Sequence, residues 1–186
     1  MSKTLMGIFQ EIDKLSKPKK PTKNKHVSVK HTKSFHKNKK TIDKTILKTL
    51  DDGEIIYGEQ ALKAYFPKYL ERQTTDYDIY SCNPRRDAVE AERALDKRFG
   101  GDYFYVKKAE HPGTFKVVAH ANQEGYADFT EMPQKAPYKT INGHRYIDLS
   151  VEKEHRLKSL KDPNSSWRHG KDQDALNRIK AYEENK

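Results

Sequence analysis

Hydrophobic positions divide this 186-residue chain into a sparse N-terminal stretch and a regularly patterned remainder. Within residues 5–15, apolar side chains recur at spacings of three and four, which predicts one short amphipathic helix over residues 1–16. Residues 17–40 hold ten lysines, no acid and almost no apolar residues. Such a stretch cannot bury enough apolar surface to offset the entropy lost on ordering, so we expect it to be disordered. We therefore predict a lysine-rich tail over residues 1–40 and a folded domain over residues 41–186.

From Thr41 onward the apolar residues alternate between the periods typical of helices and of strands. Helical spacing predicts helices over residues 42–50, 59–66, 85–99, 150–161 and 170–184. Short apolar runs and two-residue alternation predict strands over residues 54–57, 76–80, 102–108, 113–120, 125–130, 138–141 and 144–149. His111-Pro112-Gly113 and Asn142-Gly143 predict hairpin turns. This order of elements predicts an α/β (α+β) fold, a mixed β-sheet with helices packed on one side.

The positive charge of the chain is concentrated in the tail. The whole sequence carries a net charge of +10, and its first 50 residues hold 14 lysines and three acids. The remaining residues are therefore nearly neutral. A dense run of lysines suits a polyanion, and we expect it to contact nucleic acid. An anionic surface, an acidic protein or a role as a solubilising linker are the alternatives that the same charge allows.

Several classes of protein are excluded by composition. We expect no membrane span, because the sequence contains no run of about 18 apolar residues. The first residues lack the apolar core of a secretory signal. A single cysteine, Cys82, excludes an internal disulfide framework and a cysteine zinc cluster, and it fits a reducing compartment. We therefore expect an intracellular, cytoplasmic protein, and the sequence does not indicate its oligomeric state.

Candidate chemistry begins with a pair of acids on one predicted strand. Asp76 and Asp78 are two residues apart, so their side chains leave the same face of the strand. Two such charges about 5 Å apart repel by roughly 3 kcal/mol at an effective dielectric of about 20. A divalent cation reverses that sign, and oxygen ligands suit Mg²⁺ or Mn²⁺. The alternative is an edge strand on which both acids face water.

Two further features lie before and after this pair. Gly58 stands between a short apolar strand and a helix, where a glycine lets phosphate approach the backbone and the helix N-terminus offers free N–H groups. Asp128 lies in a predicted strand between apolar neighbours, and an acid in such a place needs a partner. A strand–Gly–helix unit, an acidic pair and a distant acid thus follow one another in order.

These segments, IIYGEQAL, RQTTDYDIY and YADFT, resemble the DNA polymerase β-type nucleotidyltransferase superfamily. The likeness covers about residues 54–182 and is strongest to the compact branch with viral poly(A) polymerases and the nucleotidyltransferases of toxin–antitoxin systems. KDQDALNRI near the end resembles an element of that branch. The resemblance implies a nucleotidyltransferase fold in which Asp76, Asp78 and Asp128 bind two Mg²⁺ or Mn²⁺ ions and act as the catalytic residues. It also implies nucleotide-binding roles for Gly58, Glu59, Gln60, Arg72, Thr75 and Lys171; the alternative for Lys171 is a surface pair with Asp172.

The implied activity is metal-dependent transfer of a nucleoside monophosphate from an NTP to an acceptor hydroxyl. An RNA 3′ end held by the lysine-rich tail is the acceptor that this reading favours. Glu59 departs from the family pattern, which has Gly or Ser there. Either its side chain points away along the helix, or the site binds nucleotide poorly. The second case leaves the alternative of an inactive nucleotidyltransferase-fold protein that binds nucleic acid through its tail, as a virion or packaging protein. The branch that it resembles suggests a viral source.

Overall fold

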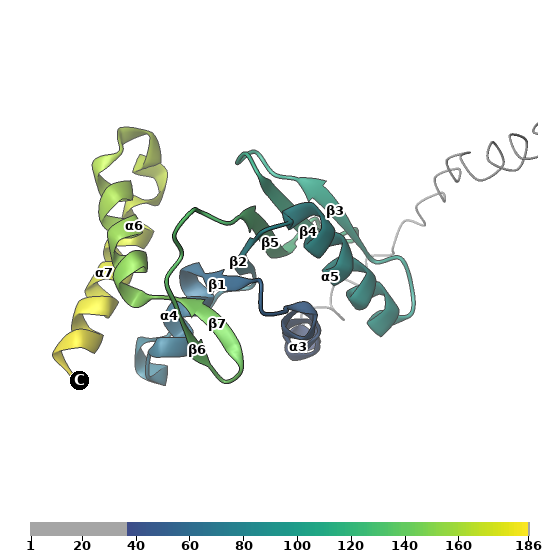
Figure 1. The fold of residues 1–186 in the computed structure, drawn as a ribbon, viewed down its shortest axis with the longest axis horizontal. Helices are drawn as coiled ribbons and strands as arrows, with labels where there is room; N and C mark the ends of the chain where they lie inside the picture. The colour runs from purple at the N-terminus through teal and green to yellow at the C-terminus, as the bar shows by residue number, and fades with distance from the viewer. Residues whose placement is uncertain (1–36, 186) are drawn as a thin grey trace, which may run out of the picture.

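The structure is a computed structural model that describes residues 37–185. The helix predicted over residues 1–16 and nearly all of the predicted tail lie outside the described residues, so both stay predictions. The described residues form one seven-stranded sheet (Figure 1). Its strands are β1 Ile55–Tyr57, β2 Tyr77–Ser81, β3 Phe104–Lys108, β4 Thr114–Ala119, β5 Gly125–Glu131, β6 Tyr138–Ile141 and β7 His144–Ile147.

The sheet is mixed, as the order of elements predicted. Its strands lie in the order β3-β4-β5-β2-β1-β7-β6. The pairs β2–β5 and β1–β7 are parallel, and the other neighbours are antiparallel. The β3–β4 and β6–β7 hairpins form the two edges of the sheet. The predicted turn between β6 and β7 is confirmed, with φ angles of 51° at Asn142 and 82° at Gly143 that suit a two-residue hairpin.

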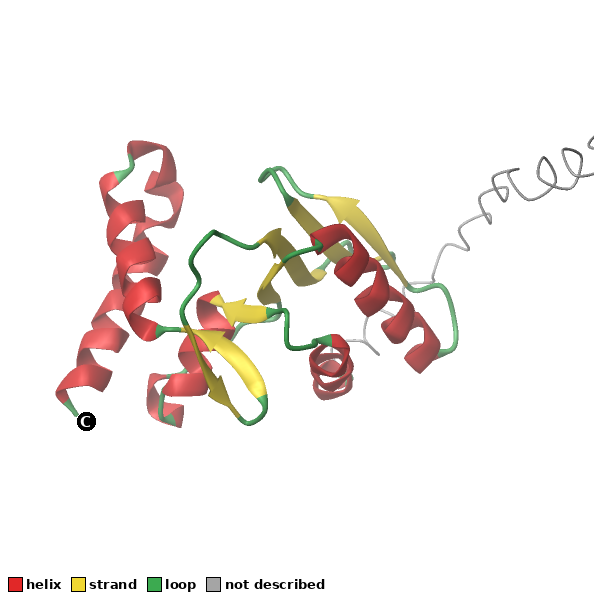
Figure 2. Cartoon of the chain, in the orientation of Figure 1, coloured by secondary structure: helices red, strands yellow, loops and turns green. Residues whose placement is uncertain are grey.

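Helices cover the sheet on both faces (Figure 2). The described helices are α3 Lys39–Thr49, α4 Gly58–Tyr65, α5 Pro84–Phe99, α6 Leu149–Lys161 and α7 His169–Glu184, with short 3₁₀ turns η1 Lys68–Leu70 and η2 Pro163–Arg168. No described helix has the length and apolar character that crossing a membrane requires.

Helices α3 and α5 bury their apolar stripes on one face of the sheet. Ile46 of α3 and Leu95 of α5 are fully buried against Ile79 of β2 and Phe129 of β5. Helix α5 begins with a proline at its first turn and ends at Gly100, whose φ of 74° gives a left-handed C-cap. Helix α3 begins two residues before the predicted boundary at Thr41.

Helix α4 packs on the opposite face, which corrects the prediction that helices lie on one side only. Its Ala61 joins Ile55 and Tyr80 in a second cluster, and its Leu62 packs against Ile179 of α7. Neighbouring residues of β1 point to opposite faces and both are buried, so both faces need cover. Helices α6 and α7 lie side by side at the end of the molecule that β6 and β7 close (Figure 1).

Candidate metal and nucleotide site

The acids that the sequence singled out meet where β2 and β5 run in parallel. The register pairs Asp78 of β2 directly with Asp128 of β5. Paired residues on adjacent strands point to the same face, and the strands lie about 4.8 Å apart. Asp76 immediately precedes β2, and its Oδ1 accepts a hydrogen bond from Thr74 Oγ1 at 2.8 Å. Parallel pairing therefore brings together acids that are 50 residues apart in sequence.

Burial and mutual repulsion disfavour the charged forms of these carboxyl groups. Burial, together with the neighbouring charges of Asp76 and Asp128, raises the pKa of Asp78 to about 7. Burial also raises the pKa of Asp128, although Lys116 opposes this rise. These carboxyl groups are difficult to ionise together without a cation. A bound divalent metal ion would favour their charged forms.

A lysine from the neighbouring strand holds the third acid. Lys116 of β4 is paired with Asp128 in the antiparallel register, and its Nζ lies 2.5 Å from Asp128 Oδ2. The oxygens of Asp76, Asp78 and Asp128 do not all approach within 4.8 Å of one another in the described residues. Such a group does exist on the α5 side of the sheet, formed by Glu92, Asp96 and Asp102. The donor set of the predicted trio thus fits a hard cation by its chemistry, while Asp128 is directed toward Lys116.

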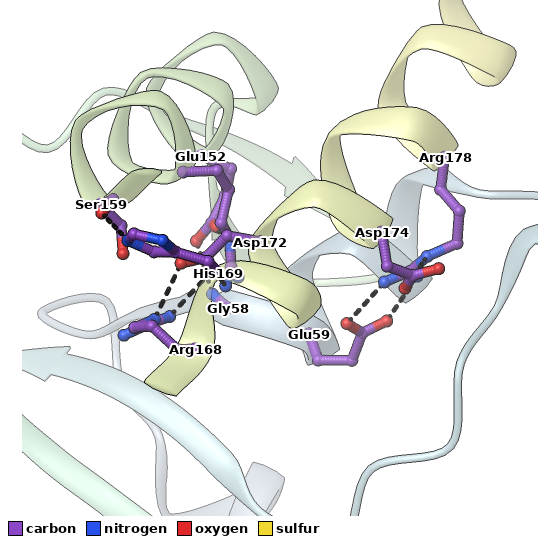
Figure 3. A network of polar contacts seen from close by, with 10 residues as sticks. Gly58, Glu59, Glu152, Ser159, Arg168, His169, Asp172, Asp174 and Arg178 are labelled. Carbon is purple, nitrogen blue, oxygen red and sulfur yellow. Dashed lines mark hydrogen bonds and ion pairs between the residues drawn. The ribbon is translucent and has the colours of Figure 1, made fainter. Parts of the chain in front are cut away.

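Gly58 is the first residue of α4 and lies against Asp78. Its φ is 69°, and a Cβ at this position would overlap Asp78 Oδ2 and lie 3.2 Å from its Cγ. The Gly58 N–H donates to Oε1 of buried Glu152 at 2.5 Å (Figure 3). Only glycine satisfies both the backbone angle and the contact with Asp78. The amide of Gly58 is therefore already bonded, which the sequence did not indicate.

The side chain of Glu59 is directed toward α7, as the first of the two readings of this residue requires. Its carboxylate forms a two-point ion pair with Arg178 of α7, with distances of 2.7 Å from Nη1 to Oε1 and 2.9 Å from Nη2 to Oε2. Figure 3 shows the pair beside Asp174. The next residue, Gln60, donates from Nε2 to the carbonyl of Asp76 at 3.2 Å. The Glu59 side chain is thus paired with α7, and the Gln60 side chain connects the start of α4 to Asp76, just before β2.

The remaining predicted nucleotide-binding residues are Arg72, Thr75 and Lys171. Arg72 and Thr75 are in the loop between η1 and β2, where the Thr75 carbonyl accepts from Lys39 Nζ at 3.1 Å. Lys171 is exposed on α7, whereas its neighbour Asp172 is fully buried. Asp172 therefore does not form the surface pair with Lys171 that was the alternative for that lysine.

Asp172 belongs to a buried charge network that sequence reasoning missed. Its carboxylate accepts hydrogen bonds from Arg156 Nη1 at 2.8 Å and from Arg168 Nε at 3.0 Å. Arg156 also donates from Nη2 to Glu152 Oε2 at 3.1 Å, and Glu152 links the network to Gly58. Nothing in the pattern of α6 or α7 marks Glu152 as buried. Lys116, in contrast, could have been assigned to Asp128 once the register of the β4–β5 pair was known.

Comparisons with known proteins agree with this architecture. The crystal structure of the Megavirus polyadenylate synthase matches with a TM-score of 0.66 and 21% sequence identity, over 95% of this chain and 35% of that one. The chain has the nucleotidyltransferase fold. It spans about a third of the length of the Megavirus chain. No protein-family model and no curated protein matches the sequence.

Two further solved structures are similar at a lower level. JHP933 from Helicobacter pylori matches with a TM-score of 0.49 and 17% identity, over 75% of this chain and 63% of that one. The antibiotic-resistance factor ANT(2'')-Ia matches with a TM-score of 0.47 and 17% identity, over 76% of this chain and 80% of that one. The fold assignment rests on the Megavirus structure and on the topology described above.

Proposed function

We propose that this protein transfers a nucleoside monophosphate from an NTP to an acceptor hydroxyl with the help of divalent metal ions. The observation that carries the proposal is the parallel register that sets Asp78 beside Asp128, with Asp76 two residues before Asp78. Gly58 supports it, because the absent side chain lets the start of α4 approach Asp78. The fold shared with a polyadenylate synthase supports it as well.

The three acids are the residues that would hold the metal ions. Two bound Mg²⁺ or Mn²⁺ ions would neutralise charge on the triphosphate and activate the acceptor hydroxyl. Asp78 presents its carboxylate from β2, Asp76 from the residue just before that strand, and Asp128 from β5. Asp128 is also the group that would take up the proton of the acceptor. The acceptor oxygen forms a bond to the α-phosphorus while the bond to pyrophosphate breaks.

The start of α4 is the element that would bind the nucleotide phosphates. The N–H groups of its first turn lack partners within the helix, and the helix dipole favours an anion there. Because Glu152 takes the amide of Gly58, we assign this role to the amides of Glu59 and Gln60. The pairing of Glu59 with Arg178 keeps its negative charge away from that position.

We propose an RNA 3′ end as the acceptor and the lysine-rich tail as the segment that holds it. The dense lysines of residues 17–40 would neutralise backbone phosphates, and binding of a single strand should weaken with salt at a slope of about −0.7 per phosphate contact. A deletion that tests this contribution should end at residue 36, because Ile42 and Ile46 of α3 are fully buried in the core.

Incubation with each labelled NTP, Mg²⁺ or Mn²⁺ and a short RNA tests the activity. The wild-type protein should extend or label the RNA, and the double variant Asp76→Ala, Asp78→Ala should not, although its affinity for RNA should be unchanged. A wild-type protein that forms no labelled product and binds neither Mn²⁺ nor NTP contradicts the proposal.

A second candidate function is binding of nucleic acid without turnover. Two contacts favour it, since Lys116 holds Asp128 and Glu152 holds the Gly58 amide that an active site could offer to phosphate. On this view the double variant loses nothing measurable, and deletion of residues 1–36 abolishes binding of RNA. Product formation by the wild type and by the Asp76→Ala, Asp78→Ala variant therefore decides between the two candidate functions.

A further inference from the structure

Four charged residues and a tyrosine form a row across the sheet at the level of the candidate metal site. The registers of four neighbouring strand pairs align Lys107 of β3, Lys116 of β4, Asp128 of β5, Asp78 of β2 and Tyr57 of β1. Residues aligned in this way share one face of the sheet. Two like charges directly opposite each other are destabilising, so Lys116 needs the neighbouring acid. The row thus places two lysines next to two aspartates.

The contact within this row concerns the same carboxylate that a metal ion would need. Lys116 Nζ lies 2.5 Å from Asp128 Oδ2, and the side chain of Asp128 is 14% exposed, against 37% for Lys116. Mg²⁺ binds oxygen at about 2.0–2.1 Å and requires a near-ideal arrangement of ligands. An ammonium group and a divalent ion cannot both occupy this side of one carboxylate, because both are positive and both need its oxygen.

We propose that Lys116 is a built-in competitor of the metal ion, a positioning residue that sets the metal affinity of the site through Asp128. This inference rests on the proposed function, since it concerns the same three acids. Without metal, Lys116 neutralises Asp128 and stabilises the acid pair. Metal binding then requires that the ammonium group leave Asp128, and the flexible stem of Lys116 and its partial exposure permit this movement.

Titration of free Mn²⁺, followed by its electron paramagnetic resonance signal, measures this competition directly and without turnover. Lys116→Met should bind Mn²⁺ about tenfold more tightly than the wild type, which corresponds to about 1.4 kcal/mol. Lys107→Met is the matched control, because it removes the same charge from the same row one strand farther from Asp128. It should change the affinity by no more than about twofold, since the interaction of charges falls with distance. Asp128→Asn should weaken binding in either background.

Thermal unfolding supplies a second readout. Lys116→Met should lower the midpoint without metal, because Asp128 loses its counter-ion, and Mn²⁺ should raise the midpoint more than in the wild type. Lys116→Gln, which keeps a polar end and removes the charge, serves if the Met variant does not fold.

Equal Mn²⁺ affinity of the wild type and both Lys116 variants overturns the inference, and so does an equal gain in Lys107→Met. In either case a wild type that binds Mn²⁺ and forms product leaves the proposed function standing. The proposed function itself is contradicted if neither the wild type nor the Lys116 variants bind Mn²⁺ and the wild type forms no product.

Discussion

Replacing Gly58 by alanine should damage the candidate site more than it damages the backbone. At a φ of 69° an L-residue is strained, at a cost of roughly 1–2 kcal/mol. Alanine also reduces the entropy of the unfolded chain, which offsets about 0.4–1 kcal/mol of that cost. The added Cβ overlaps Asp78 Oδ2, so the Asp78 side chain must leave its rotamer, at a further cost of about 0.5–1.5 kcal/mol. We expect a net loss of about 2 kcal/mol.

Gly100→Ala is the matched control for this variant. Its φ of 74° carries the same backbone strain, but a Cβ there meets no atom within 4 Å. Urea denaturation should therefore give a loss of about 1 kcal/mol for Gly100→Ala, from the strain and the entropy of the unfolded chain alone.

Metal binding separates the two effects. Gly58→Ala should weaken Mn²⁺ binding at least tenfold, because Asp78 is displaced, whereas Gly100→Ala should bind Mn²⁺ like the wild type. The reasoning is refuted if the two variants lose equal stability and keep equal Mn²⁺ affinity. That result would mean that Asp78 can move freely without consequence for the site.

Three further outcomes follow from the structure. Arg178→Ala should destabilise the protein by about 1–3 kcal/mol, because Glu59 keeps a partly buried charge without its partner; adding Glu59→Gln should restore part of the loss, and an unchanged double variant would argue against this pairing. Burial raises the pKa of Glu54 to about 8, so the folded state favours its neutral form. The stability that this group contributes is present below about pH 4.5 and is lost as pH rises through about 8. Midpoints of thermal unfolding should therefore fall less with rising pH in Glu54→Gln than in the wild type, and parallel curves would contradict the assignment. Deletion of residues 1–36 should leave the midpoint of unfolding unchanged and weaken binding of single-stranded RNA, as measured by fluorescence anisotropy at two salt concentrations; equal affinity before and after deletion would exclude the tail from binding.

Local patterns were sufficient to place most of the elements. The apolar spacing over residues 85–99 predicted a helix that the structure confirms within one residue. The Asn142-Gly143 turn was equally well specified, because few residues other than Asn and Gly accept positive φ at two successive positions. The alternation around Asp78 predicted β2, although Asp76 lies just before the strand and not in it.

Contacts between distant segments could not be derived in this way. The sequence did not indicate which partner the Glu59 side chain has, because Arg178 lies more than 100 residues later. Burial of Glu152 depends on how α6 packs against α4, and the periodicity of α6 carries no signal of it. The cover on the second face of the sheet was missed for the same reason.

The sequence alone determined the order of strand, glycine, helix and spaced acids, because each of these local units depends on the conformational preferences of neighbouring residues. Whether Asp128 meets Asp78, and which cation lies beside it, depends on strand registers that are fixed by the packing of the whole sheet. A shift of one residue in the β2–β5 pair would turn Asp128 to the other face, so the site exists only because tertiary packing selects one register.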